Sequence, residues 1–145
     1  MGASGWHYFT EHNNDLSAAL TTLKAQVFSA GTYFDAHRAY PSLRGGAAYS
    51  PPKTVRELMA RCAEDGTHSI LDMSTIAATE DYGVVRPLTD DERLALFGTT
   101  TPTRDMMLSA GWEQLRTRRS RGWCTPFYTD AGAPDGLFFW GSSGD

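Results

Sequence analysis

The sequence has no long apolar run and only two cysteines, and each shortage excludes a class of protein. No apolar stretch approaches the roughly 18 residues that span a bilayer, so we expect no membrane segment. Cys62 and Cys124 lie far apart without metal-ligand spacing, which favours buried free thiols over a disulfide. His7 and His12 could share a metal ion, but the spacing indicates no third ligand. We therefore expect neither a metal nor a cofactor.

The chain also lacks the positive charge that polyanion binding requires. Its 145 residues carry 13 Lys and Arg against 17 Asp and Glu, a formal net charge of -4. Nucleic acids and anionic membranes select proteins with a basic face, so nucleic acid is an unlikely partner and a membrane is not expected. The one basic concentration, Arg116 to Arg121, is typical of a solvated connector. The first residues show no signal-peptide pattern, so we expect a cytoplasmic location.

Aromatic side chains, by contrast, gather at the two ends of the chain. They are Trp6, Tyr8 and Phe9 near the start, and Trp123, Phe127, Tyr128, Phe138, Phe139 and Trp140 near the finish. Chain ends are usually polar and loose, so aromatic ends indicate burial. We expect both ends to be strands of one sheet, with a first strand at 6–10 and a final hairpin at 122–140.

Apolar spacing and capping residues predict three to four helices. Apolar residues recur at helical spacing over about Asp15 to Ala30, and Gly31 is a stop signal. The capping-box patterns Thr54 to Glu57 and Thr89 to Glu92 predict two further helix starts. Thr101-Pro102 predicts a fourth, because proline is favoured at the first helical position.

Residues 31–52 show no regular period, since proline and glycine interrupt it. We interpret this segment as either a binding loop or a mobile insertion. The stretches 68–73 and 81–86 favour neighbouring strands, joined by a turn at 77–80. The closing hairpin and the lack of regular βαβ units predict one α+β domain over residues 1–145, with a mainly antiparallel sheet.

Polar residues that could carry chemistry lie in three places. His7 and Glu11 could exchange a proton, although both could equally be exposed beside a helix cap. Asp72 could line a pocket, or could be a buried carboxylate paired with Arg86 or Arg104. Arg104, at a predicted helix start, could bind a phosphate or carboxylate, or could pair with a surface carboxylate.

Several segments resemble those of small uncharacterised proteins from actinobacteria. They are Trp6 to Thr10, Ser69 to Asp72, Phe97-Gly98 with Pro102 to Arg104, and Gly141 to Asp145. The resemblance covers most of the chain and is poorest from Tyr33 to Ser50. It implies one compact bacterial domain, and it transfers neither an activity nor a catalytic residue.

Two functions from different classes fit these observations. A small acidic protein without a catalytic motif is typical of an immunity or other toxin-neutralising protein, whose partner would be encoded nearby. The alternative is a small enzyme or small-molecule-binding protein with an aromatic-lined pocket that uses His7, Glu11, Asp72 and Arg104. Candidate side chains for contact with a partner or ligand are Trp6, Tyr8, Tyr33, Tyr40, Arg121, Trp123 and Trp140. We favour the first hypothesis, because no motif identifies a reaction.

Overall fold

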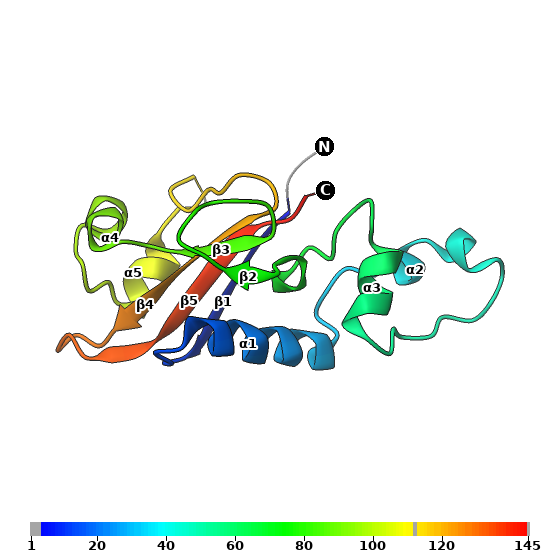
Figure 1. The fold of residues 1–145 in the computed structure, drawn as a ribbon, viewed down its shortest axis with the longest axis horizontal. Coiled ribbons are helices and arrows are strands. Elements are labelled where there is room, and N and C mark those ends of the chain that lie inside the picture. The colour runs from blue at the N-terminus through cyan, green and yellow to red at the C-terminus, as the bar shows by residue number, and fades with distance from the viewer. Residues whose placement is uncertain (1–3, 112, 145) are drawn as a thin grey trace.

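A computed structural model describes residues 4–111 and 113–144, which are built around one five-stranded sheet (Figure 1). The strands are β1 (Gly5–Glu11), β2 (Thr75–Ile76), β3 (Val84–Pro87), β4 (Arg121–Tyr128) and β5 (Pro134–Ser142), in the order β1-β5-β4-β3-β2. β1 and β4 are antiparallel to β5, whereas β3 is parallel to β4 and β2 is parallel to β3. The α+β class is confirmed. The sheet is mixed, so the prediction of a mainly antiparallel sheet holds only for its β1-β5-β4 half.

Within the described residues there are five α-helices and two short 3-10 helices. They are α1 (Leu16–Ala30), α2 (Ala36–Ala39), η1 (Pro41–Arg44), α3 (Val55–Arg61), η2 (Ile70–Asp72), α4 (Asp90–Phe97) and α5 (Arg104–Ser109). α1 begins where Asp15 accepts the Ala18 N–H and ends at Gly31 with φ of 69°, as its sequence predicts. Thr89 and Glu92 form a complete capping box at the start of α4. None of these helices is long and apolar enough to cross a membrane.

Residues 68–73 do not form the predicted strand. Ser69 accepts the Leu71 N–H at 3.2 Å and starts η2 instead. His68 has φ of 52°, a left-handed conformation that a strand does not tolerate. The apolar run that suggested a strand comes from burial on all sides, because Ile70 and Leu71 are both in the core. The strand of this region is β2, and it reaches β3 by a parallel connection rather than a hairpin.

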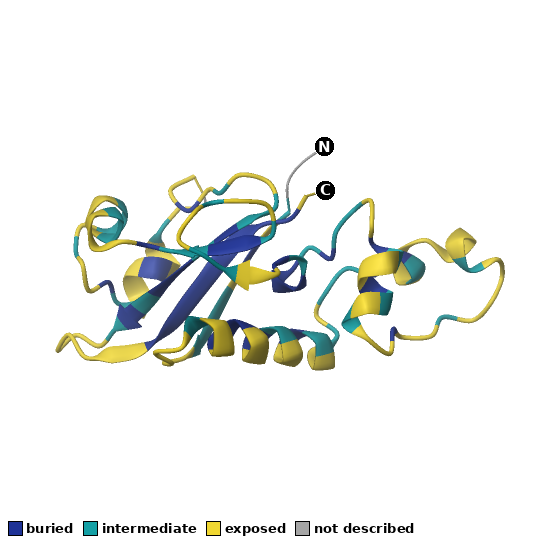
Figure 2. Cartoon of the chain, viewed as in Figure 1, coloured by how far each residue is buried: buried dark blue, intermediate teal, exposed yellow. Residues whose placement is uncertain are grey.

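Both faces of the sheet are covered, and the aromatic ends of the chain lie inside (Figure 2). On one face, α1 packs its buried residues Ala19, Leu20, Leu23 and Val27 into the cluster that holds Trp6, Leu137 and Phe139. On the other face, α5 contributes Met107 to the cluster that holds Phe127, Phe138 and Trp140. Burial of this aromatic surface is the main stabilising term for so small a sheet.

Residues 31–62, from the end of α1 to the end of α3, project from one end of the sheet and are called the arm (Figure 1). The sequence indicated no regular structure over 31–52, but α2 and η1 form there. Asp35 begins α2 by accepting the His37 N–H at 2.9 Å. Most of the arm is solvent-exposed (Figure 2).

Candidate functional site

A hollow of about 670 Å³ lies beside the last residues of β1. Its walls come from the β1 end, from one side of α1, from the start of α5, and from the ends of β4 and β5 that meet at their turn. The lining residues are Phe9, Thr10, Glu11, His12, Asn13, Ala19, Thr22, Leu23, Gln26, Arg104, Phe127 and Asp135. The hollow thus joins an aromatic floor to a rim that carries both signs of charge.

The aromatic floor is Phe9 with the two rings that hold it. Phe9 stacks on Phe138 with centroids 4.7 Å apart, and its edge meets Phe127 at 5.5 Å. The Arg104 guanidinium lies 4.3 Å from the centre of the Phe9 ring, within the range of a cation–π contact. This contact holds the charged group of Arg104 at the hollow.

The position of Arg104 follows from the way α5 begins. Thr103 caps the helix by accepting the Met106 N–H, and Thr103 also bridges to Tyr128 at the end of β4. The Tyr128 N–H in turn donates to the Pro102 carbonyl at 2.9 Å. The start of α5 is therefore attached to the end of β4, and Arg104 follows directly.

The acidic side of the rim comes from two strands that pair with each other. Glu11 is paired with Gly136, so Asp135 lies next to the Glu11 position on the neighbouring strand. His12 shares a hydrogen bond of 3.1 Å with Asn14 in the turn before α1. Two carboxylates, an imidazole and a guanidinium therefore surround one hollow, a set that can recognise a ligand with charges of both signs.

The outer edge of β1 forms one side of this region. β1 lies at the edge of the sheet and pairs over all seven of its residues with β5. In the described part of the chain, the main-chain groups of residues 5–11 neither donate to nor accept from main-chain groups outside the sheet. The outward N–H and C=O groups of β1 thus have no main-chain partner among the described residues, whereas the opposite edge, β2, is only two residues long.

The structure brings together only part of the predicted polar set. Glu11 and Arg104 line the hollow, while His7 lies exposed on β1 with its ring 6.3 Å from that of Phe9. Asp72 lies elsewhere, where it accepts the Thr67 N–H at 2.8 Å and the Ser143 hydroxyl at 2.6 Å. The four residues do not form one site.

Asp72 belongs to a polar network between η2 and the end of the chain. Neither of the predicted arginine partners contacts it, because Arg86 pairs with Glu92 at 2.8 Å and Arg104 lies over Phe9. Burial raises the pKa of the Tyr8 phenol, and the Asp72 carboxylate adds to this rise. Burial also lowers the pKa of Lys24, whose amine donates to the Met73 carbonyl.

The predicted contact residues are distributed over the whole molecule. Trp6 and Trp140 are buried in the two core clusters, and Trp123 and Tyr8 pack beside them, so the terminal sheet offers little free aromatic surface. Tyr33, at the start of the arm, stacks on Phe28 of α1, and Tyr40 is exposed farther along the arm. Arg121 lies 4.1 Å from the centre of the Tyr82 ring. Only Tyr40 among them is a large exposed side chain.

Sequence reasoning missed the residues that other elements bring to the hollow. Thr22 and Gln26 are exposed polar positions of α1, and nothing in their spacing distinguishes them from the rest of that face. Asp135 was assigned to a turn, and only the pairing of β1 with β5 places it beside Glu11. The sequence had indicated Glu11, His12 and Arg104 as polar candidates, and Phe9 and Phe127 as members of the aromatic ends.

The fold and the hollow define a small α+β protein with a free sheet edge. The chain matches no protein-family model, no curated protein and no solved structure. The resemblance to small actinobacterial proteins therefore stays a prediction. Among the described residues, no group of three or more His, Cys, Asp and Glu side chains is placed to hold a metal ion.

Proposed function

We propose that this protein is an interaction protein that binds an extended segment of a protein partner along the free edge of β1. An edge strand presents unpaired N–H and C=O groups, and an added strand satisfies them. The observation that carries the proposal is the continuity between this edge and the hollow, because main-chain pairing supplies affinity and a pocket beside it selects a side chain.

β1 lacks three of the features that commonly protect an edge strand. Natural edge strands are commonly blunted by proline, by lysine or by a bulge. β1 contains neither residue type, and its register with β5 runs from Gly5 to Glu11 without a shift. An unprotected edge of seven residues in a small protein is a reason to expect a partner there.

The charges of the rim indicate the kind of segment. Arg104 offers a guanidinium to a carboxylate, and Glu11 with Asp135 offers two carboxylates to a lysine or arginine. The acidic net charge of the chain supports a partner that is basic overall, as for an immunity or toxin-neutralising protein. Complementary charge mainly speeds association and selects among partners.

A random-peptide display selection against the purified protein tests the proposal. Selected peptides should protect β1 amides from hydrogen exchange, because their main chain covers the outward groups. The double variant Thr22→Arg with Gln26→Arg crowds the hollow from exposed α1 positions and should abolish binding. Peptides that bind without protecting residues 5–11 contradict the proposal.

The matched control is Thr21→Arg with Ala25→Arg. These positions are also exposed and have the same spacing on α1, but neither lines the hollow. This control adds the same charge to the same helix, so it should bind the selected peptides as tightly as the unchanged protein. Equal loss in both double variants would show that the hollow is not involved.

A second candidate function is the binding of a small molecule in the hollow. The observation that favours it is the convergence of Phe9, Arg104 and Glu11, since ligand sites combine apolar walls with a few polar groups. A thermal-shift screen with zwitterionic and anionic metabolites distinguishes the two functions. A small ligand should raise the melting temperature without protecting β1 amides, and Arg104→Ala should remove the effect.

A further inference from the structure

The arm differs in charge from the rest of the chain. It holds five of the 13 Lys and Arg residues but only two of the 17 Asp and Glu residues. The remaining residues therefore carry eight basic against 15 acidic side chains. Two of these 15 carboxylates, Glu64 and Asp65, follow directly after the arm. The molecule is thus a projecting basic segment on a strongly acidic body.

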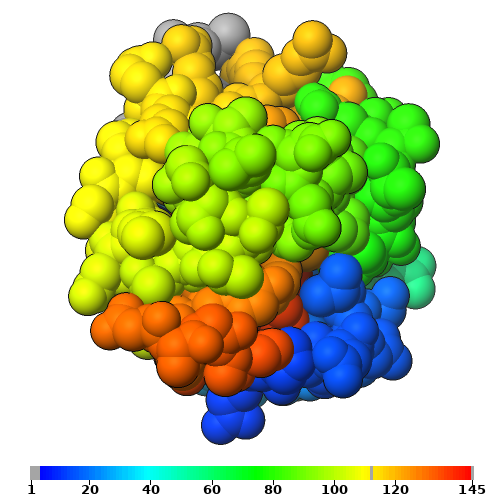
Figure 3. All heavy atoms as spheres, turned by 90° about the vertical axis from the view of Figure 1, so that its left-hand side faces the viewer, coloured from blue at the N-terminus to red at the C-terminus, as the bar shows by residue number. Residues whose placement is uncertain are grey.

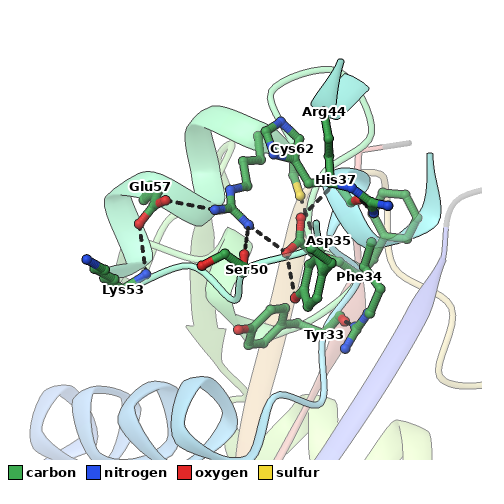
Figure 4. A network of polar contacts seen from close by, with 12 residues as sticks. Tyr33, Phe34, Asp35, His37, Arg44, Ser50, Lys53, Glu57 and Cys62 are labelled. Carbon is green, nitrogen blue, oxygen red and sulfur yellow. Dashed lines mark hydrogen bonds and ion pairs between the residues drawn. The ribbon is translucent and has the colours of Figure 1, made fainter. Parts of the chain in front are cut away.

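A buried carboxylate gives the arm a defined shape (Figure 4). Asp35, 1% exposed, accepts hydrogen bonds from Tyr49 at 3.0 Å and from Arg61 at 3.1 Å. Arg61 also donates to the Ser50 carbonyl and pairs with Glu57. Because this network connects α2, the following loop and α3, the arm has one ordered conformation to present to a partner.

Two basic side chains of the arm face solvent. Lys53 and Arg56 are exposed, and neither forms an ion pair with any of the described residues. The arm also exposes the side chains of Tyr40, Leu43 and Met59. A basic surface with exposed apolar side chains is typical of a docking face.

The opposite end of the molecule has the complementary character. α4, α5 and the β4–β5 turn lie together there, away from the arm (Figures 1 and 3). We call this surface the acidic end; its exposed carboxylates are Asp90, Asp91, Asp105 and Asp130, and its exposed apolar side chains are Leu94, Met106 and Leu108. Among the described residues, the large exposed hydrophobic side chains are these three, the three of the arm, and Tyr82.

We infer that the arm of one copy docks on the acidic end of a second copy. The arm has an excess of basic side chains and the acidic end has an excess of carboxylates, although Arg93 pairs with Asp90 there. Each surface also contributes apolar side chains that the contact would remove from water. A second copy is the occupant that the chain itself supplies. The acidic end adjoins the hollow, but none of the residues changed in the test below lines it, so the failure of this inference and that of the function proposed for β1 can be told apart.

The position of the two surfaces determines the form of the assembly. They lie at opposite ends of one molecule, so the contact is heterologous rather than two-fold symmetric. After two copies pair, one keeps a free acidic end and the other keeps a free arm, so further copies can add to form short head-to-tail chains or a ring. Such an assembly grows with concentration and weakens with salt, because salt screens exposed charges.

Sedimentation velocity over about 10 μM to about 1 mM protein tests the inference. At about 20 mM NaCl the weight-average mass should rise with concentration, and at about 500 mM NaCl it should fall back. The double variant Lys53→Glu with Arg56→Glu should raise the dissociation constant by roughly tenfold or more, because it places like charges against the acidic end. Leu43→Ser should also raise the dissociation constant, because it removes an exposed apolar side chain of the arm.

Two further variants make the test specific. Arg118→Glu with Arg119→Glu changes the net charge by the same amount at exposed positions outside the arm, and should associate as the unchanged protein does. Asp91→Lys with Asp130→Lys should not self-associate, because its acidic end now carries basic side chains. It should bind the Lys53→Glu, Arg56→Glu variant, because that arm now carries carboxylates. A monomer at every concentration at low salt, equal weakening by the Arg118, Arg119 control, or no binding in the exchanged mixture would overturn the inference.

Discussion

The Arg61 guanidinium donates a hydrogen bond to the Asp35 carboxylate at 3.1 Å inside the arm. The side chain of Asp35 is fully buried, whereas that of Arg61 retains 11% of its exposure. A buried carboxylate with a guanidinium, a phenol and an amide N–H as donors is fully satisfied. Its role is to connect the parts of the arm, and this role leads to the first prediction.

Asp35→Ala should destabilise the arm by about 3 kcal/mol, because it leaves a partly buried guanidinium and a phenol without their acceptor. Limited proteolysis under native conditions should show faster cleavage within residues 38–56. Glu57→Ala removes the other carboxylate partner of Arg61 but at an exposed position, so its effect should be small. Equal cleavage of the two variants would contradict this assignment.

Asp72 and Ser143 should be energetically coupled. The Ser143 hydroxyl donates to Asp72 at 2.6 Å, and Ser143 is fully buried. A double-mutant cycle with Asp72→Ala and Ser143→Ala, measured by urea denaturation, should give a coupling of about 1 kcal/mol. Additive effects would show that the two side chains do not depend on each other. A coupled pair supports a structural role for Asp72 in place of the catalytic role considered from sequence.

Gly141→Ala should destabilise the protein by about 1–3 kcal/mol. An added Cβ at this position would lie 2.4 Å from the Arg121 carbonyl and 2.4 Å from Cζ2 of Trp6. The Trp6 ring therefore occupies the space that a side chain at 141 would need. Gly111→Ala is the control, because a Cβ there meets nothing within 4 Å. A thermal melt of both variants measures the difference, and a neutral Gly141→Ala would disprove this packing.

Stability should fall above pH 9 through Cys124. Burial raises the pKa of this thiol to about 12, from an ordinary value of 9.0. A folded-state pKa above the unfolded one means that the unfolded state loses its proton first, so stability is complete below pH 9 and decreases up to about pH 12. The slope should reach about 1.4 kcal/mol per pH unit in this window. In urea denaturation, the stability of Cys124→Ala should fall less steeply between pH 9 and about pH 12 than that of the unchanged protein. An equally steep fall in both proteins would contradict the prediction.

Local signals predicted the helices well, because the information lies in neighbouring residues. Asp15 and Gly31 specify the two ends of α1 through their own hydrogen bond and dihedral angle. The same holds for Thr89 and Glu92 at α4. Residues 68–73 could not be assigned from local signals, because an apolar run is compatible with a buried strand and with a buried 3-10 turn. The packing of Ile70 and Leu71 decided between them.

The amino-acid sequence by itself determined the α+β class, the burial of the aromatic ends and the starts of α1, α3 and α4, because these depend on local hydrogen bonds and on the removal of apolar surface from water. Only the tertiary structure decided the mixed sheet, the separation of Asp72 from Glu11 and Arg104, and the projecting arm. Each of these depends on which distant segments pair. The β1–β5 register places Asp135 beside Glu11, and no property of either residue alone indicates that neighbour.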